Sequence, residues 1–553
     1  MPLLLFTNIM KKSVLLALAL ICSGAWAQHN HNFTLQDTLR GSITPEREWW
    51  DLNFYHLKVD VKPDDKFISG SNIIRYEVLK PYQKLQVDLQ PPLKIDKVIQ
   101  DGEILQVKSV GNAHFVTLKK PQIKGQTNEI TVHYSGHPKE AVRAPWDGGL
   151  SWKKDESGQH FIATSCQGLG ASVWWPNKDH MYDEVDSMKI SVTVPEDLMD
   201  VSNGQLIGVD HNQEEKTKTY HWSVANPINN YGVNLNIADY VHFDDIFNGE
   251  NGELQLDFYV LKPNLEKAKK QFTQASKMLE AFEYWFGPYP FYEDGFKLVE
   301  VPYLGMEHQS SVTYGNGYEN GYLGRDVSGS GWGLKFDFII IHESGHEWFA
   351  NNITYKDIAD MWIHESFTSY SENLYLDYYF GKQASSEYVI GIRKNIANDA
   401  PIIGQYNVNS SGSSDMYYKG ANMLHTLRQL IDDDQKWRSI LRGLNSEFYH
   451  QTVTTEQIEG YISEKSGIDL TAFFNQYLRT VKIPKLQLKI SGKTLKYRYV
   501  NIVEDFDMPV RIDINGKTQW IQPNAKWQKL KAASTIGDLE VDENFYIESE
   551  PIK

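Results

Sequence analysis

The sequence has very little cysteine and no long apolar run beyond its N-terminal end. Cys22 and Cys166 are the two cysteines among 553 residues, and removal of an N-terminal signal would leave Cys166 alone. An internal disulfide is then excluded, so stability must come from large hydrophobic cores. A transmembrane helix needs about 20 consecutive apolar residues, and no later segment offers them. We therefore expect several large domains and no transmembrane segment.

The sequence also has fewer basic than acidic residues. Lys and Arg number 55 against 71 Asp and Glu, which gives a formal net charge of -16. Nucleic acids are bound by basic surfaces, so we expect no nucleic-acid partner. An acidic surface is also a common means of staying in solution, and it indicates no particular partner. The oligomeric state is left open.

Residues 1–27 have the features of a signal peptide. Two lysines precede an apolar run, and Ala25-Trp26-Ala27 supplies the small-x-small pattern of a cleavage site. Cleavage before Gln28 would export the protein to the periplasm or the extracellular space. The alternative is a lipoprotein modified at Cys22, although the Ala-Leu-Ile before it fits that pattern poorly.

The remaining sequence predicts a multidomain α+β protein. Period-two alternation, as in Met188-Ile190-Val192-Val194, is typical of half-buried strands and indicates an antiparallel β domain over 28–245. A mainly helical region follows over 246–483. Alternation returns after Pro484, which predicts a small β module over 484–553.

Within 246–483 the pattern of apolar residues predicts several helices and one strand. Gly and Pro at 287–288 mark the end of the first helix. A Gly-rich stretch at 315–333 predicts a surface loop near a site. The expected helices span 265–286, 336–352, 358–380, 387–399 and 419–433, with a helical cluster over 455–479 and a strand over 296–301.

The second of these helices in sequence order, 336–352, contains a candidate metal site, His342-Glu343-x-x-His346. On a helix His342 and His346 lie one turn apart, so both imidazoles project from one face and can bind one Zn²⁺. Glu343 can reach a zinc-bound water without ligating the metal. The alternative is an ordinary buried helix whose histidines are satisfied by hydrogen bonds.

Glu365 favours the zinc interpretation. It lies on the next predicted helix, and a turn between the two helices can place its carboxylate opposite the histidine pair. Two His and one Glu with a fourth position open to water are the ligand set of catalytic zinc. We therefore predict one zinc ion per chain, bound by His342, His346 and Glu365, with Glu343 as the general base of a hydrolysis.

Neighbouring residues have less specific interpretations. His364 faces about 100° away from Glu365 on a helix, which favours a packing role. Glu372 lies two turns after Glu365 and can either orient a ligating histidine or form a surface ion pair. Glu347 and the buried Cys166 are interpreted as structural.

The zinc motif, its spacing and the Trp362-x-x-Glu365 context resemble the aminopeptidase N family of zinc metallopeptidases, gluzincins distantly related to thermolysin. This family carries Gly-x-Met-Glu-Asn, whose Glu holds the substrate's α-amine. Leu304-Gly305-Met306-Glu307-His308 is similar to it but departs at Leu304 and His308. The resemblance implies that Glu307 binds the amine and that Gly305 and Met306 contact the substrate.

Two further segments resemble the same family. Tyr417-Tyr418-Lys419-Gly420 matches Tyr-x-Lys-Gly, which implies that the Tyr417 hydroxyl donates to the oxyanion. Thr164-Ser165-Cys166-Gln167 is similar to the family's Thr-Gln-x-Glu/Gln segment, which implies that Gln167 lines the amine site. Where relatives have Glu, Gln167 carries one negative charge less.

The resemblance covers roughly residues 40–485 and implies a saddle-like β domain followed by a thermolysin-like catalytic domain. We expect no counterpart of the long helical domain that ends many family members, because only about 70 strand-like residues follow Pro484. The expected function is an exported zinc aminopeptidase that acts on peptides with a free N-terminus. The alternatives are an endopeptidase or epoxide hydrolase with the same zinc chemistry, and a non-catalytic peptide-binding homologue.

Overall fold

The computed structural model describes residues 32–552. The predicted signal peptide, with Cys22, therefore lies outside the described residues. Within the described part, none of the helices has the length and apolar character needed to cross a membrane.

The N-terminal region is built from β-sheets. A short helix α2 (Leu35–Gly41) precedes the strands. The largest sheet has eight strands in the order β13-β14-β11-β1-β2-β8-β4-β5, with β1 parallel to β11 and its other pairs antiparallel. Its strands are β1 (Trp50–Lys62), β2 (Phe67–Val78), β4 (Lys94–Gln100), β5 (Glu103–Ile104), β8 (Thr127–Gly136), β11 (Ser187–Pro195), β13 (Gln205–Asn212) and β14 (Thr217–Val224).

Two smaller sheets complete this region. One is β3-β7-β6 and the other is β12-β15-β10-β9, which leads towards Gln167. Their strands are β3 (Lys84–Asp88), β6 (Gln106–Val110), β7 (Ala113–Thr117), β9 (Gly149–Lys154), β10 (His160–Ser165), β12 (Met199–Val201) and β15 (Asn236–Ala238). Alternate residues of β1 and β2 are buried, because one face of each strand packs on a core that contains Trp49, Trp50 and Trp174.

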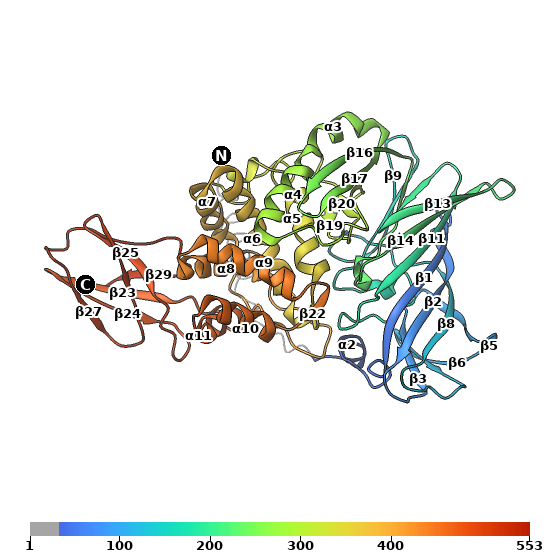
Figure 1. Cartoon of the computed structure of the whole chain (residues 1–553), viewed down its shortest axis with the longest axis horizontal. Helices are drawn as coiled ribbons and strands as arrows, with labels where there is room; N and C mark the ends of the chain where they lie inside the picture. Colours follow the sequence, from blue (N-terminus) through green and yellow to red (C-terminus); the bar gives the residue numbers. More distant parts are fainter. Residues whose placement is uncertain (1–31, 553) are drawn as a thin grey trace, which may run out of the picture. The chain divides into compact units, whose positions relative to one another are not determined.

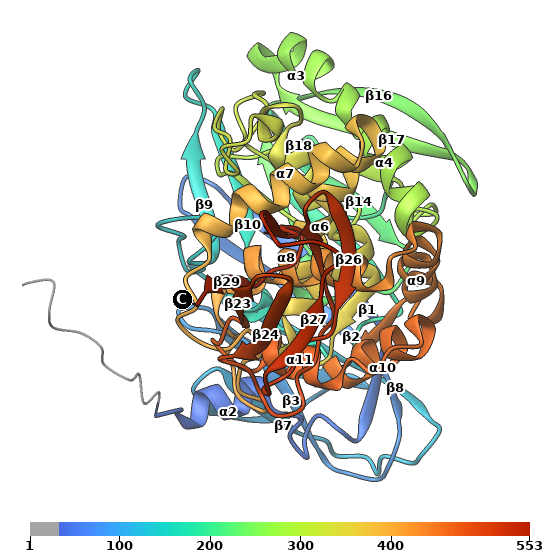
Figure 2. The ribbon, with the colours of Figure 1, turned by 90° about the vertical axis from the view of Figure 1, so that its left-hand side faces the viewer.

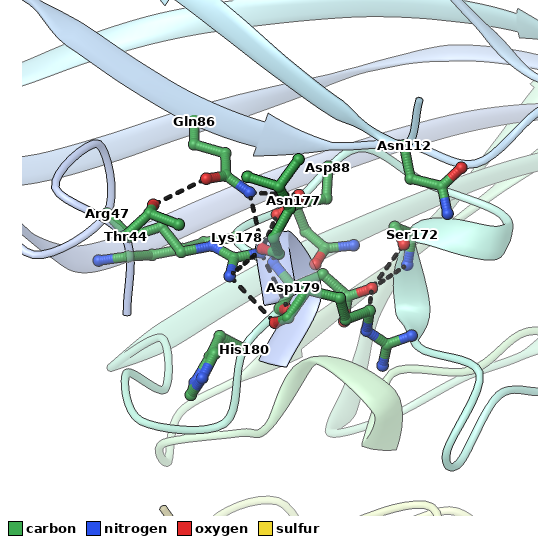
Figure 3. A network of polar contacts seen from close by, with 12 residues as sticks. Thr44, Arg47, Gln86, Asp88, Asn112, Ser172, Asn177, Lys178, Asp179 and His180 are labelled. Atoms are coloured by element: carbon green, nitrogen blue, oxygen red, sulfur yellow. Dashed lines mark hydrogen bonds and ion pairs between the residues drawn. The ribbon is translucent and has the colours of Figure 1, made fainter. Parts of the chain in front are cut away.

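Beneath these sheets lies a buried network of paired charges (Figure 3). Arg47 Nη2 lies 2.6 Å from Asp88 Oδ2, and its other nitrogen Nη1 donates to three backbone carbonyls. Lys178 pairs with Asp183, and Arg40 Nε lies 3.5 Å from Asp179 Oδ2. Each cation of this network therefore has an acidic partner.

The central region combines one five-stranded sheet with helices (Figure 1). The sheet order is β16-β17-β18-β20-β19, which leaves β19 as an edge strand. Its strands are β16 (Tyr240–Gly249), β17 (Gly252–Leu261), β18 (Phe296–Glu300), β19 (Gly305–Met306) and β20 (Val312–Tyr314). The helices are α3 (Leu265–Gln271), α4 (Thr273–Phe286), α5 (Phe338–Gly345), α6 (Trp362–Phe380), α7 (Lys382–Ile392), α8 (Tyr418–Ile431), α9 (Asp434–Glu447), α10 (Thr455–Ser466) and α11 (Thr471–Leu478), with a two-stranded pair β21 (Ile353–Tyr355) and β22 (Gln451–Val453).

The C-terminal residues form two small sheets next to α8 and α11 (Figures 1 and 2). Their orders are β27-β24-β23-β29 and β26-β25-β28. Their buried side chains, including Tyr499, Phe506 and Phe545, belong to the same hydrophobic core as the central helices. The strands are β23 (Lys485–Ser491), β24 (Thr494–Val500), β25 (Val510–Ile514), β26 (Lys517–Ile521), β27 (Gln528–Lys531), β28 (Leu539–Val541) and β29 (Glu548–Pro551).

The predicted multidomain α+β class is confirmed, whereas several predicted helices differ in extent. The single helix expected at 265–286 is interrupted at Phe272, between α3 and α4. The helix expected at 387–399 begins earlier, as α7, and ends in a short 3₁₀ turn at Arg393–Asn395. Helix α9 was not expected, because most of its residues are charged or polar. Its few apolar residues, which include Trp437, Ile440 and Leu444, form one narrow buried face. The domain boundaries 28–245, 246–483 and 484–553 stay predictions.

Candidate active site

Helix α5 holds His342 and Glu343 in a fixed place. Asp337 caps the helix by accepting hydrogen bonds from the amides of Ile339 and Ile340, at 3.1 and 3.3 Å. The first turn is apolar and buried, so the helix cannot rotate without exposing it. The His342 and His346 rings lie 5.1 Å apart between centroids, as expected for residues one turn apart.

The helix predicted to extend to Asn352 ends early, and this ending orients His346. After Gly345 the chain forms a wider turn over 347–352 with non-helical backbone at Phe349 and Ala350. Ala350 has a φ of 156°, a strained value for a residue with a Cβ. The turn brings the Phe349 carbonyl 3.0 Å from His346 Nδ1. His346 Nδ1 is therefore a donor, and its Nε2 is free for another partner.

Helix α6 brings Glu365 opposite the two histidines. The two helices approach closely at Gly345, where a Cβ would lie only 2.7 Å from Ser371 Oγ. Glu365 Oε2 lies 3.4 Å from His346 Nε2 and 3.8 Å from His342 Nε2. Ligand atoms about 2.1 Å from a tetrahedral zinc ion are about 3.4 Å apart. The spacing therefore suits one zinc ion.

Two other observations fit a metal at this point. Glu365 Oε2 is buried and has no hydrogen-bond partner in the described structure, although buried acceptors are nearly always paired. His342 Nδ1 lies 2.8 Å from Glu372 Oε1, and Tyr388 donates to the other oxygen of Glu372 at 2.5 Å. Glu372 thus orients His342 by bonding its Nδ1, which leaves Nε2 of His342 free for the metal. Metal-binding histidines usually have such a partner.

Glu343 lies beside this cluster without being part of it. Ligand atoms of Glu343, Glu307 and His346 are within 4.8 Å of one another, as are those of His342, His346 and Glu365. Burial raises the pKa of Glu343 to about 7, and the Glu307 carboxylate also raises it, while His342 acts in the opposite direction. A carboxyl group with a pKa near neutrality can both accept and return a proton.

Glu365 has the opposite electrostatic behaviour. Burial disfavours its charged form, but His346 and His342 outweigh that effect and hold the pKa of Glu365 well below its ordinary value. It is therefore an anion across the physiological range, as a metal ligand must be. Burial raises the pKa of Tyr417 well above its ordinary value, and the nearby Glu365 and Glu307 carboxylates raise it further. The Tyr417 hydroxyl is thus kept protonated as a donor.

A further carboxylate, that of Glu307, is held between the β domain and the three candidate zinc ligands. Gln167 Nε2 donates to Glu307 Oε1 at 2.5 Å and to Glu365 Oε1 at 3.1 Å. Tyr231 donates to the same Glu307 oxygen at 3.2 Å. Asn351, just after the kink, donates to the Glu307 carbonyl at 3.0 Å. Burial raises the pKa of Glu307 above its ordinary value.

Gly305 and Met306 form the edge strand β19 in the wall of the same cavity. A Cβ on Gly305 would lie 2.6 Å from Ile339 Cγ2 and 3.0 Å from the Thr313 carbonyl. Only glycine therefore allows the strand to pass so close to α5. Because β19 ends the sheet, it can pair with an extended peptide through its backbone.

These residues surround one cavity of about 340 Å³. The structure brings all nine predicted site residues to its wall: Gln167, Gly305, Met306, Glu307, His342, Glu343, His346, Glu365 and Tyr417. Leu304 also lines the cavity, whereas His308 is buried outside its wall, within hydrogen-bond distance of Thr313. The departure from the family pattern at His308 thus lies behind the site.

Sequence reasoning missed several residues of this cavity. Tyr231, in the short 3₁₀ turn Asn230–Gly232, is not itself a lining residue but donates a hydrogen bond to Glu307, and no motif marks it. Trp146 lies on the segment between β8 and β9, lines the cavity and is 70% exposed. Further lining residues from other elements are Pro145, Tyr322, Phe338, Ile339, Ser369, Asn395, Ser414 and Asp415.

Other residues weighed from the sequence lie elsewhere. His364 is buried against Tyr355, whose amide donates to His364 Nε2 at 2.9 Å, so it faces away from Glu365. Cys166 is buried and its thiol contacts the Tyr231 carbonyl at 3.4 Å. Burial raises the pKa of the Cys166 thiol, which makes it unreactive.

Comparison with known families identifies this architecture. The profile described as Peptidase family M1 domain matches residues 270–477, and that described as Peptidase M1 N-terminal domain matches 52–231. A β domain joined to a helical domain with a His–His–Glu cluster defines a metallopeptidase. The chain belongs to the M1 family of zinc metallopeptidases.

Individual relatives are distant. A probable aminopeptidase 1 of Sulfurisphaera tokodaii is 22% identical over 86% of this chain, and a leukotriene A-4 hydrolase of Xenopus laevis is 22% identical over 81%. The chain spans 62% of the former and 74% of the latter. The match therefore leaves more than a third of the first relative's length uncovered.

Solved structures share the fold. An M1 zinc metallopeptidase mutant of Deinococcus radiodurans, bound to a Tyr-Ser-Ala substrate, superposes with a TM-score of 0.65 at 19% identity. The match covers 79% of this chain and 96% of the other.

Proposed function

We propose that the protein is a zinc-dependent aminopeptidase that removes N-terminal residues from peptides. Zinc held by His342, His346 and Glu365 would polarise the scissile carbonyl and activate water. Glu343, with its raised pKa, takes a proton from the attacking water and returns it to the leaving amine. The protonated Tyr417 hydroxyl donates to the developing oxyanion.

The observation that carries this proposal is the buried Glu307 carboxylate next to the candidate zinc ligands. Its side chain is 3% exposed and is held by Gln167 and Tyr231, yet it lines the cavity. A buried carboxylate needs a cation, and a peptide's ammonium group satisfies this need only at a free N-terminus. Ligand atoms of Glu307, Glu343 and His346 lie within 4.8 Å of one another, so an ammonium group bound at Glu307 would belong to the residue next to the bond to be cut. The tripeptide bound by the Deinococcus relative is consistent with this class of substrate.

A pair of peptides tests the proposal. The same tetrapeptide is assayed with a free and with an acetylated N-terminus, each with and without a zinc chelator. We expect chelator-sensitive release of the first residue from the free peptide alone. Equal cleavage of both peptides, or cleavage in mid-chain, would indicate an endopeptidase. Absence of cleavage from both would support the non-catalytic homologue.

Epoxide hydrolysis is a second candidate, favoured by the similarity to the Xenopus leukotriene A-4 hydrolase along 74% of that protein. An amphipathic epoxide added to the same assay distinguishes the two reactions. Diol formation that exceeds peptide cleavage would replace the aminopeptidase proposal.

We further propose that the protein is exported after cleavage before Gln28. The basic start, the apolar run and Ala25-Trp26-Ala27 support this. N-terminal sequencing of the protein recovered outside the cytoplasm should begin at Gln28. A lipid-modified Cys22, or an intact leader, would contradict it.

A further inference from the structure

The C-terminal β module contacts the elements that carry Tyr417. Between β28 and β29 the chain crosses back to the helices over residues 542–547, here called the strap. Figures 1 and 2 show the module against α8, whose N-terminal flank is Tyr417. The inference below rests on the proposed function, because it assigns the strap a part in the same reaction.

The strap is bonded directly to α8. The Tyr546 amide donates to Thr426 Oγ1 at 2.9 Å, and His425 Nε2 lies 2.9 Å from Asn544 Oδ1. Behind the strap, Tyr477 of α11 donates to the Tyr546 carbonyl at 2.7 Å. Burial lowers the pKa of His425 to about 3, so this contact is between neutral groups. The strap is therefore joined to the middle of α8 by two hydrogen bonds, of which the one to Thr426 is buried.

A second set of contacts joins the strap to the segment after α7. Arg393 Nη1 donates to the Glu543 carbonyl at 2.7 Å, and its guanidinium lies 5.4 Å from the centre of the Tyr546 ring. Arg393 Nε also donates to Asn422 of α8 at 2.6 Å. Asn398 donates to the Tyr546 hydroxyl at 3.3 Å. The ring of Tyr546 thus lies between α8 and residues 393–398.

These residues in turn hold the turn before Tyr417. Asp415 accepts hydrogen bonds from the amides of Ala397 and Asn398, at 2.8 and 2.6 Å. Asp415 belongs to the 3₁₀ turn Ser414–Met416, and the Tyr417 amide donates to the Ser414 carbonyl at 3.2 Å. Ser414, Asp415 and Tyr417 all line the active-site cavity. A continuous path of contacts therefore runs from Tyr546 to Tyr417.

We propose that Tyr546 is a positioning residue that holds the Tyr417 hydroxyl in place for the reaction through Arg393, Asn398 and Asp415. Tyr417 approaches the site from a turn and not from inside a helix, so its position depends on what packs behind that turn. A shift of about 1 Å at a catalytic group can cost up to about a hundredfold in rate. The C-terminal module would therefore support catalysis without touching the substrate.

A double-mutant cycle tests this proposal in the full chain. Tyr546→Ala is made in the wild type and in Tyr417→Phe, which retains measurable activity because one donor is worth about 10²- to 10³-fold. We expect Tyr546→Ala to lower kcat about tenfold with KM within about twofold. In the Tyr417→Phe background the same change should alter kcat by less than about twofold, since the group being positioned is already absent.

Matched variants separate positioning from general destabilisation. Tyr546→Phe keeps the ring beside Arg393 but loses the hydroxyl that Asn398 bonds, so its kcat should lie between those of Tyr546→Ala and the wild type. Trp527→Ala removes another aromatic side chain that lies 4.6 Å from an arginine, Arg498, in the same module. It should leave kcat unchanged. If Tyr546→Ala does not fold, Arg393→Met breaks the same path and is measured in its place.

The outcomes are distinct. Equal losses of kcat from Tyr546→Ala in both backgrounds would overturn the positioning role while leaving the proposed function intact. An unchanged kcat in Tyr546→Ala would do the same. Absence of chelator-sensitive cleavage from the wild type would instead contradict the proposed function, and the role of the strap with it.

Discussion

Two clusters of buried charge lie in different regions of the chain, and their composition differs. In the β domain, three cations face three anions: Arg40 with Asp179, Arg47 with Asp88 and Lys178 with Asp183. Figure 3 labels Arg47, Asp88, Lys178 and Asp179 of this cluster. The active-site cavity is lined by five carboxylates and two histidines: Glu307, Glu343, Glu365, Glu372, Asp415, His342 and His346. No Lys or Arg lines this cavity in the described part of the chain.

The difference indicates what each cluster is for. Buried charges that are paired within the chain need nothing further and serve the fold. The unbalanced cavity lacks positive charge, which a divalent metal and a substrate ammonium would in part supply. Single neutralising substitutions should therefore have opposite consequences in the two regions.

The largest expected effect is on catalysis. Glu343→Gln removes the proton acceptor and should lower kcat by about 10³- to 10⁴-fold. Its thermal stability should be unchanged or higher, because one carboxylate is removed from an unbalanced cluster. Steady-state kinetics and a melting curve measure both quantities. Glu347→Gln, in a buried carboxylate outside the cavity wall, should keep kcat within about fivefold. A similar loss in both variants would contradict the base assignment.

The corresponding neutralising substitution in the β domain is Asp88→Asn. It leaves Arg47, which is 0% exposed, without its ionic partner. We expect the free energy of unfolding to fall by about 3 kcal/mol, with kcat unchanged at temperatures where the variant is folded. Denaturant unfolding measures the shift. In the exposed pair Lys66–Glu140, Glu140→Gln should cost less than about 1 kcal/mol. Equal costs would show that burial of the pair is irrelevant.

Glu307→Gln tests whether the excess negative charge of the cavity binds the ammonium group of the substrate. Neutralising this carboxylate removes the partner of the ammonium group, and kcat/KM on free-amine peptides should fall about a hundredfold. Metal content should stay unchanged, because the zinc ligands are intact. Kinetics on free and acetylated peptides check this result. An equal fall on both peptides would place Glu307 in the chemistry and not in amine recognition.

The smallest expected effect concerns Trp146 at the mouth of the cavity. A large apolar side chain that is 70% exposed usually marks a binding surface. Trp146→Ala should raise KM by about five- to tenfold with kcat little changed. Trp527→Ala, 41% exposed in the C-terminal module, serves as the control. If both variants have the wild-type KM, Trp146 does not contact the substrate.

The sequence predicted the fold class and nine residues that line the cavity, and the three candidate zinc ligands among them have a physical reason. Metal ligands must lie on regular elements at fixed spacing, so His342, His346 and Glu365 are visible as a pattern. Gln167, Glu307 and Tyr417 were found by resemblance, since no local periodicity marks them.

What the sequence could not predict depends on tertiary contacts. The end of the motif helix at Phe349 and Ala350 is set by the carbonyl bonded to His346, which helix propensity does not encode. Helix α9 has few apolar residues and is helical because its narrow apolar face packs on α4 and α10. Trp146 reaches the cavity from the segment between β8 and β9, and Tyr231 bonds Glu307 from a short 3₁₀ turn.

Zinc stoichiometry measured together with activity tests the central claim most directly. Metal-free protein is titrated with Zn²⁺ while bound metal and release of the first residue from a free-amine peptide are followed. We predict that activity rises with metal to a plateau at about one equivalent per chain, and that Glu365→Gln abolishes both tight binding and turnover. Full activity in the metal-free protein, or unchanged zinc binding in Glu365→Gln, would contradict the account.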